Sequence, residues 1–329
     1  MKKNIAIVAG GDSSEVVVSL KSADGIYSFI DKSAYNLYVV ILKKGDWSVR
    51  LGDNQMVPVD KNDFSFVKDG VRTHFDFAYI TIHGTPGENG LLQGYFDLIG
   101  MPYSCCGVLA SSITFNKFVC NNYLKSFDVN VADSIRLFKG ESMADDEIVK
   151  RLGLPVFVKP NDGGSSFGVT KVKEIGQLKE AISKAFDEGQ EVLIESFISG
   201  TEVTCGCYKV NGKEVVFPLT EVVTSNEFFD FDAKYNGQVD EITPARISVE
   251  MTEKIQRETL RIYDILGAKG IIRVDYIIQA NGEAKMLDIN TTPGMTVTSF
   301  IPQQVRAAGL DIKDVMSDII SNELNKVRK

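Results

Sequence analysis

Residues 270–290 read Gly-Ile-Ile-Arg-Val-Asp-Tyr-Ile-Ile-Gln-Ala-Asn-Gly-Glu-Ala-Lys-Met-Leu-Asp-Ile-Asn. Two alternating apolar runs flank Asn281-Gly282, which is the strongest short-range signal for a β-hairpin with a two-residue turn. Counting outward from that turn pairs Asp275 with Asp288. The stretch therefore predicts a hairpin that sets two carboxylates directly opposite each other.

The same count places Arg273 opposite Asn290, and side-chain alternation puts all four polar residues on one face. Paired side chains on a sheet face lie about 5 Å apart at Cβ, so the two acids would repel each other without a cation between them. Asp and Asn offer hard oxygen ligands, which suit Mg²⁺ or Mn²⁺. The same repulsion predicts that Asp275→Asn slightly stabilises the metal-free protein.

The alternative to a metal site is an exposed polar face on an edge hairpin. That alternative leaves the apolar character of the opposite face unexplained. The residues of this opposite face are Ile272, Val274, Tyr276, Ile278, Leu287 and Ile289.

Composition limits the class of protein. The chain has 329 residues, enough for two or three domains, and its net charge of −8 argues against a nucleic-acid partner. No apolar run approaches the roughly 20 residues of a membrane span. The apolar start is too short for a signal peptide, so we expect a cytoplasmic protein. Five cysteines without metal-binding spacing, and only two histidines, predict reduced core thiols rather than a zinc site.

The first hundred residues alternate strands with helices. Apolar runs at 4–9, 37–42 and 77–82 predict strands of a parallel α/β sheet. Two of these runs end at Gly10-Gly11 and His83-Gly84, and ligands bind beyond such carboxyl ends. No G-x-G-x-x-G follows the first strand, which argues against a dinucleotide site.

From residue 106 the pattern changes. We expect a helix near 116–127, a helix at 176–187, a helix that ends before Gly267, and two C-terminal helices after the hairpin. Expected strands cover 133–138, 156–159, 168–173, 191–196, 202–210 and 213–217, and 220–247 is irregular. These patterns predict three domains: 1–105, 106–195 and 196–329.

Residues 156–168 place Lys159 at the end of a strand, before a Gly/Ser-rich loop. Small residues let backbone N–H groups point at one anion, and the lysine adds a charge. This predicts a phosphate site without the Walker sequence; the alternative is an ordinary surface loop. The loop also matches the hydrolase motif G-x-S-x-G, but that motif needs a following helix and a later histidine. A strand is expected instead, and both histidines come earlier.

Three further segments complete the pattern. The stretch 191–202 places Glu195 and Glu202 around an apolar pair and could serve a purine and a ribose; the alternative is an exposed strand end. The aromatic-rich stretch within 220–247 is long enough for a lid. Backbone N–H groups of 290–295 could hold an oxyanion beside the metal.

Together these motifs resemble the D-alanine–D-alanine ligases. The resemblance runs in order along nearly the whole chain. It rests on Gly10-Gly-Asp-Ser-Ser-Glu15, the stretch His83–Gly94, the loop after Lys159, Ala233-Lys-Tyr235, Arg273-Val-Asp275 and Asn290-Thr-Thr-Pro-Gly294-Met. The family resemblance implies the ATP-grasp fold, α/β and α+β, with an N-terminal Rossmann-like parallel-sheet domain.

The resemblance also implies roles for single residues. ATP would be bound by Lys117, Lys159, Ser165, Ser166, Glu195, Phe197, Ile198, Glu202, Lys234 and Asn290. Two Mg²⁺ or Mn²⁺ ions would be bound by Asp275, Asp288 and Asn290. The two D-alanines would be bound by Glu15, His83, Arg273, Gly294 and Ser299. Catalysis would depend on Glu15, Ser165, Tyr235, Arg273 and Gly294, with Ser165, Tyr235 and Glu15 forming a hydrogen-bonded chain.

The implied activity is ATP-dependent ligation of two D-alanines through an acyl phosphate, for peptidoglycan synthesis, by a homodimer. Two positions depart from the family pattern. Asp288 stands where a glutamate is usual, and Val16 stands where an arginine is frequent. Alternatives are a D-alanine–D-lactate ligase, which Tyr235 argues against, another carboxylate–amine ligase, or an ATP-binding regulatory protein without catalysis.

Overall fold

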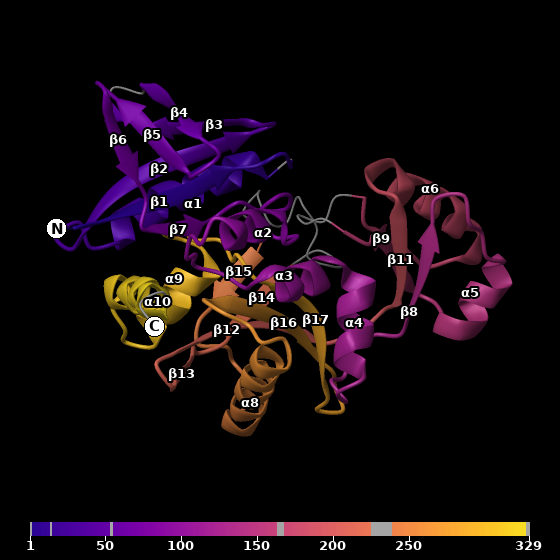
Figure 1. Ribbon diagram of the computed structural model, residues 1–329. Helices are drawn as coiled ribbons and strands as arrows, with labels where there is room; N and C mark the ends of the chain where they lie inside the picture. The colour runs from indigo at the N-terminus through magenta and orange to yellow at the C-terminus, as the bar shows by residue number, and fades with distance from the viewer. Residues whose placement is uncertain (1, 14, 53–54, 163–167, 225–238, 327–329) are drawn as a thin grey trace.

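The computed structural model describes residues 2–13, 15–52, 55–162, 168–224 and 239–326. Three β-sheets follow one another along the chain. In Figure 1 they form an upper indigo and purple part, a right-hand magenta part and a lower orange part. The described structure mixes α/β and α+β arrangements, in agreement with the expected fold class.

The first sheet has seven strands in the order β6-β5-β4-β3-β2-β1-β7. Its strands are β1 (Lys3–Gly10), β2 (Tyr35–Lys43), β3 (Asp46–Arg50), β4 (Met56–Asp60), β5 (Ser65–Lys68), β6 (Val71–His74) and β7 (Phe77–Ile80). The three strands β2, β1 and β7 pair in parallel, which confirms the expected parallel sheet there. The antiparallel strands β3–β6 were not predicted, because four or five residues show too few alternations to stand out.

Helices cover the first sheet on both sides. They are α1 (Val16–Phe29) and α2 (Leu91–Leu98), joined by the C-terminal helices α9 (Phe300–Ala307) and α10 (Ile312–Lys326). Ile7 of β1 and Ile26 of α1 share one core with Met316 of α10. The two ends of the chain therefore pack together, and the yellow α10 lies beneath the indigo strands in Figure 1.

The second sheet is antiparallel, in the order β10-β9-β11-β8. Its elements are β8 (Ser134–Phe138), α5 (Asp145–Leu152), β9 (Val156–Pro160), β10 (Thr170–Val172), the 3-10 turn η2 (Ile175–Gln177), α6 (Leu178–Glu188) and β11 (Glu191–Ser196). Val158, Ile194 and Leu178 are buried in one core beneath α6. The predicted strands and the predicted 176–187 helix are confirmed within a few residues.

The third sheet orders its strands β15-β14-β12-β16-β17, with β13 paired to β12. Its strands are β12 (Thr201–Val210), β13 (Lys213–Val216), β14 (Thr220–Thr224), β15 (Val239–Ile242), β16 (Ile272–Ile278) and β17 (Ala284–Asn290). Helices α3 (Val108–Phe115), α4 (Lys117–Lys125) and α8 (Val249–Ile265) contribute to its core. The stretch 220–247 is thus not wholly irregular, because β14 and β15 pair at its ends; residues 225–238 lie outside the described residues.

The central hairpin has the predicted pairs but not the predicted turn. Asp275 pairs with Asp288, and Arg273 pairs with Asn290. The turn, however, has three residues: the N–H of Gly282, at φ +80°, donates to Gln279 O at 2.9 Å. A register shift between Asp275 and Tyr276 compensates for the extra residue.

That shift also corrects the predicted apolar face. Met286, opposite Tyr276, is 2% exposed and lies in the core. Leu287 is the extra residue of the bulge and is only half-buried. Met286 therefore takes the place in the apolar face that the two-residue turn assigned to Leu287.

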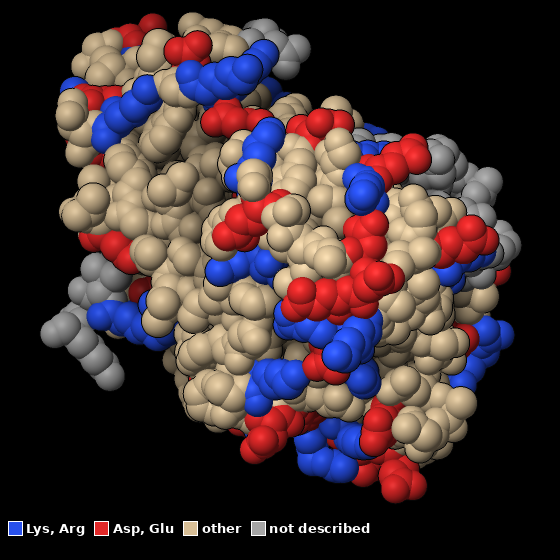
Figure 2. Space-filling model, turned by 90° about the vertical axis from the view of Figure 1, so that its right-hand side faces the viewer, with Lys and Arg blue, Asp and Glu red and all other residues tan. Residues whose placement is uncertain are grey.

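The cysteines are free thiols in the core, as predicted. All five are buried, and burial raises the pKa of Cys120 to about 12. Figure 2 shows acidic and basic side chains side by side over the face that it presents. Among the described residues, no helix has the length and apolarity to cross a bilayer.

Close packing of α1 on the loop after β17 gives a test of the fold. A Cβ at Gly25 would lie 2.1 Å from Met295 O, whereas a Cβ at Gly176 would meet nothing within 4 Å. We expect Gly25→Ala to lower the free energy of unfolding by about 2 kcal/mol through overpacking. Gly176→Ala should change it by less than about 0.5 kcal/mol. Denaturant unfolding measures both, and equal effects would contradict this packing.

Candidate active site

The polar face of the β16–β17 hairpin already contains a cation for Asp275. Arg273 donates from Nε to Asp275 Oδ1 and from Nη2 to Oδ2, each at 2.8 Å. Thr204, which pairs with Asp275 from β12, donates its hydroxyl to Oδ1 at 2.6 Å. Both carboxylate oxygens of Asp275 are therefore engaged in a half-buried, bidentate ion pair.

Asp288 has a cation from a different part of the chain. Lys117 Nζ, at the first residue of α4, lies 3.3 Å from both carboxylate oxygens. Burial alone would raise the pKa of Asp288, but Lys117 and Lys159 more than offset it and hold that pKa below its usual value. Conversely, Asp288 outweighs burial and raises the pKa of Lys117. Asp288 and Lys117 are therefore both charged at neutral pH. Each of the two opposed acids, Asp275 and Asp288, thus has a cation of the protein beside it.

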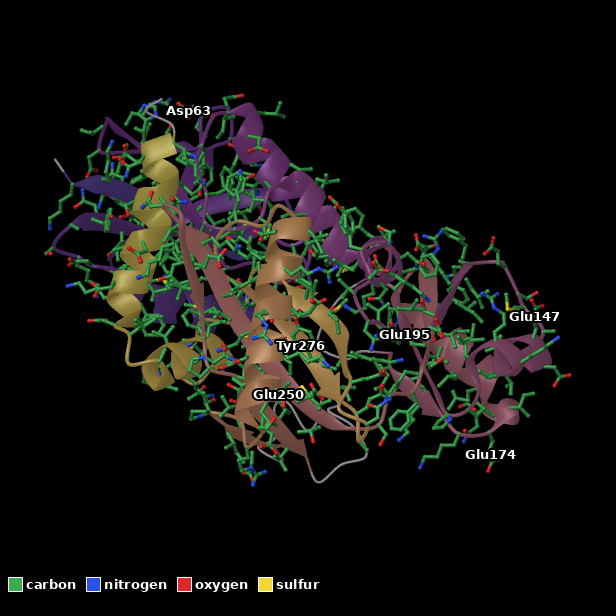
Figure 3. All side chains as sticks on the ribbon, turned by 90° about the horizontal axis from the view of Figure 1, so that it is seen from below. Asp63, Glu147, Glu174, Glu195, Glu250 and Tyr276 are labelled. Atoms are coloured by element: carbon green, nitrogen blue, oxygen red, sulfur yellow. The ribbon has the colours of Figure 1, made fainter. Side chains whose placement is uncertain are left out.

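A second lysine is held by a buried acid of the second sheet. Lys159 Nζ contacts Glu195 Oε2, and Asn121 of α4 donates to Glu195 Oε1 at 2.9 Å. Glu195 is 4% exposed, and in Figure 3 it lies on the side of the second sheet that faces the third. Because Lys159 also lowers the pKa of Asp288, the ends of the two sheets form one charged cluster.

Aromatic side chains lie beside this cluster. The rings of Phe157 and Phe197 are 5.8 Å apart, and Lys171 Nζ lies 3.9 Å from the Phe197 ring centre. The Phe197 N–H donates to Pro155 O at 3.1 Å, so its backbone amide already has a partner. Ile198 is buried next to it.

Glu202 lies two residues before Thr204 on the same face of β12. Burial works against the charge of Arg273, but Asp275, Asp288 and Glu202 together raise its pKa.

Residues of the first sheet meet the loop after β17. Glu88 accepts from the Gly84 N–H at 2.7 Å and from the Thr292 hydroxyl at 2.8 Å. Burial raises the pKa of Glu88. The charge of Glu15 raises this pKa further, and that of His83 opposes the rise. His83 is 7% exposed, and its buried Nε2 finds no hydrogen-bond partner among the described residues. Glu15 and His83 thus both lie within electrostatic reach of Glu88.

The loop after β17 brings the remaining predicted residues together. Ser299 is the N-cap residue of α9, and its hydroxyl accepts from the Thr296 N–H at 3.1 Å. A Cβ at Gly294 would lie 3.1 Å from Ser299 Oγ. The Arg273 guanidinium lies 5.1 Å from the ring of Phe300. Gly294, Ser299 and Arg273 therefore gather at the N-terminal end of α9.

Four predicted site residues lie outside the described residues: Ser165, Ser166, Lys234 and Tyr235. Sequence reasoning also missed several partners, namely Thr204, Asn121, Glu88 and Thr292. Glu88 stands inside the quoted His83–Gly94 motif and Asn121 stands four residues after Lys117 on one helix, so motif and spacing could have indicated both. Thr292 likewise stands inside the quoted motif Asn290-Thr-Thr-Pro-Gly294-Met, whereas Thr204 carries no such signal.

The hairpin face suits a divalent cation. Two opposed carboxylates and the amide of Asn290, which pairs opposite Arg273, offer only hard oxygen ligands. Within the described ranges no three His, Cys, Asp or Glu side chains cluster as a metal site. Water molecules or phosphate oxygens of a ligand would therefore complete the coordination.

Comparison with known proteins identifies one enzyme family along nearly the whole chain. A family model described as "D-ala D-ala ligase N-terminus" matches residues 4–106, and one described as "D-ala D-ala ligase C-terminus" matches residues 123–321. The chain is 76% identical over 324 residues to a D-alanine--D-alanine ligase of Parabacteroides distasonis, covering 98% of each chain.

Solved structures agree with the fold. A VanG D-Ala:D-Ser ligase from Enterococcus faecalis is 30% identical, with a TM-score of 0.89, over 98% of this chain and 100% of that one. A D-alanine--D-alanine ligase from Bacillus anthracis complexed with ATP is 28% identical, with a TM-score of 0.79, over 99% of each chain.

The ion pairs reverse the expected effect of neutralising Asp275. Asp275→Asn removes one partner of a half-buried pair and should lower the free energy of unfolding of the metal-free protein by about 3 kcal/mol. Asp264, 65% exposed in its pair with Lys209, is the matched control, because exposed pairs contribute about 0–1 kcal/mol. Chemical denaturation with a chelator present measures both variants. A stabilised Asp275→Asn protein would show that repulsion by Asp288 dominates.

Proposed function

This chain belongs to the D-alanine–D-alanine ligase family and joins two D-alanines in an ATP-dependent reaction of peptidoglycan precursor synthesis, and we propose how its residues divide that work. The observation that carries the proposal is the charged cluster of Lys117, Lys159, Asp275 and Asp288, which joins the second and third sheets. A catalyst that moves a phosphoryl group needs such a cluster of cations and metal-binding acids.

ATP binds, in this proposal, between those two sheets. Lys117 and Lys159 bind its phosphates, and the Phe197 ring and Ile198 contact the adenine. Glu195 keeps Lys159 in place, and Glu202 accepts from the ribose. As the family resemblance implies, the remaining ATP contacts come from Ser165, Ser166, Lys234 and Asn290.

Two Mg²⁺ or Mn²⁺ ions bind at Asp275, Asp288 and Asn290. When bound, the ions neutralise charge on the phosphoryl group that is transferred. Because Arg273 and Lys117 lie against the two acids, a bound ion would compete with both cations for the carboxylate oxygens. Lys117 is then available to phosphate oxygens, and Arg273 to the substrate.

The first D-alanine lies at the junction of the first sheet and the loop after β17. Glu15 accepts from its ammonium group, and His83 lies near its carboxylate. That carboxylate attacks the γ-phosphorus of ATP, giving an acyl phosphate and ADP. Activation is needed because a free carboxylate is a poor electrophile.

The second D-alanine is seated by Ser299 and attacks the acyl phosphate through its amine. The tetrahedral oxyanion that forms is stabilised by Arg273 and by the N–H of Gly294. The attacking nitrogen loses a proton, and collapse of this species breaks the bond to phosphate, leaving the dipeptide and inorganic phosphate. A hydrogen-bonded chain of Ser165, Tyr235 and Glu15 would close the site and keep water from the acyl phosphate.

The resemblance further supports a homodimer in the cytoplasm, where ATP is available. Helices α2 and α3 carry exposed apolar side chains suited to a second copy, with Leu98 89% exposed and Leu109 71% exposed. We expect a solution mass of twice 36.3 kDa, reduced to the monomer by Leu98→Glu with Leu109→Glu. A monomeric wild type would refute the dimer.

Purified protein with ATP, Mg²⁺ and D-alanine should release phosphate and form the dipeptide. Asp275→Asn should lose about tenfold or more of the activity at limiting Mg²⁺. Losing a metal ligand should cost at least as much as losing a residue that only orients a ligand, which typically costs about tenfold or more. Asp264→Asn should not. Mn²⁺ binding, followed by electron paramagnetic resonance with a non-hydrolysable ATP analogue, should weaken in parallel.

Product analysis separates the remaining possibilities. Turnover only with D-serine or D-lactate as the second substrate would contradict the dipeptide assignment while leaving the ligase chemistry. Nucleotide binding without phosphate release would contradict catalysis itself. Full activity of Asp275→Asn at limiting Mg²⁺ would refute the metal ligands.

A further inference from the structure

We propose that Asn161 is a positioning residue that fixes the spacing between Lys117 and Lys159 for ATP binding. The inference rests on the proposed function, in which both lysines bind ATP. Asn161 follows β9, two residues after Lys159, and is 0% exposed. It stands inside the stretch 156–168 that indicated the phosphate site, but the sequence pattern assigned it no role.

Both backbone groups and both ends of the Asn161 amide are hydrogen-bonded. Its N–H donates to Glu191 O at 3.0 Å, and its carbonyl accepts from the Lys117 N–H at 3.1 Å. Its side-chain Oδ1 accepts from the Phe118 N–H at 2.8 Å, and Nδ2 donates to Glu191 Oε2 at 2.7 Å. The residue therefore ties the end of β9 to the start of β11 and to the start of α4.

The contacts to α4 have a specific consequence. The first four N–H groups of a helix lack partners within the helix, and α4 begins at Lys117. Asn161 accepts from the first two of these groups, while the N-cap Asn116 accepts from Val119 at 2.9 Å. The first turn of α4 is thus anchored to the chain segment that carries Lys159.

Each lysine then reaches its own acid. Lys117 extends to Asp288 on the third sheet, and Lys159 extends to Glu195 on the second. Asn161 joins the two backbones from which these side chains extend. A shift of this link would misplace one ammonium group relative to the other, which would weaken phosphate binding without touching the D-alanine residues.

The position needs an amide rather than any polar group. The amide accepts from the Phe118 N–H at one atom and donates to the Glu191 carboxylate at another, which neither a carboxylate nor an ammonium group can do. Aspartate has the same shape, but it would place a second carboxylate against Glu191, whose Oε2 lies 3.5 Å from Arg136 Nη1. Asn161→Asp combined with Glu191→Gln exchanges donor and acceptor and restores the bond.

Asn322 provides a matched control in α10. It is also a buried asparagine, 8% exposed, whose Oδ1 accepts a backbone N–H and whose Nδ2 donates to a glutamate at 2.8 Å. Asn322→Asp therefore also places a second carboxylate against a glutamate, but in α10, away from Lys117 and Lys159. Any general loss of stability appears in both variants.

The test measures KM for ATP, KM for D-alanine and the affinity for a non-hydrolysable ATP analogue by calorimetry. Asn161→Asp should raise KM for ATP and weaken the analogue by about tenfold, as for one lost charge-assisted hydrogen bond. KM for D-alanine should stay within about twofold, since no D-alanine contact changes. The double variant should recover ATP affinity, and Asn322→Asp should retain it.

The proposal is overturned if Asn161→Asp binds ATP like the wild type, or if it changes both KM values equally. It is also overturned if the double variant folds but does not recover ATP affinity. Should the single variant be too unstable to purify, the double variant decides alone, with failure to fold counting against the proposal. Lys117→Ala tests the underlying function separately: normal ATP affinity there would refute the nucleotide site whatever Asn161 does.

Discussion

Two carboxylates face each other across one hairpin, and each is neutralised by a cation of the protein. Arg273 binds Asp275 from the same strand, and Lys117 binds Asp288 from α4. Like charges at this spacing would otherwise oppose folding of the third sheet. The pairs also place two cations where phosphate and an oxyanion would later need them, so the metal-free ion pairs and the proposed catalytic contacts use the same residues.

The Lys117–Asp288 pair links this hairpin to the rest of the site. Lys117 is fixed at its helix start by Asn161, and Asn161 is bonded to Glu191 of the second sheet. Glu88 makes a comparable link from the first sheet, through Thr292, to the loop after β17. Each substrate group would therefore be held by residues whose positions depend on contacts between sheets, which suits a reaction that must bring ATP and two D-alanines together.

Much of the fold followed from local patterns. Alternation and Asn281-Gly282 predicted the Asp275–Asp288 pair correctly, but only because two errors cancelled. The turn has one residue more than predicted, and the unpredicted bulge at Leu287 restores the register. A bulge of this kind depends on packing of Met286 in the core, which no local pattern reports. The short strands between 46 and 74 and the pair β14–β15 were missed for another reason: four or five residues show too few alternations to stand out, even though each strand pairs with the next one along the chain.

The partners of the site residues were harder to predict than the residues themselves. Lys117 and Asp288 are 171 residues apart in the chain, so only the folded structure shows that the acids carry internal cations. Anomalous diffraction from a complex with Mn²⁺ and a non-hydrolysable ATP analogue tests this account most directly. We expect Mn²⁺ peaks at Asp275 and Asp288, with Lys117 moved from Asp288 to a phosphate oxygen. Mn²⁺ bound elsewhere, with both ion pairs intact, would contradict it.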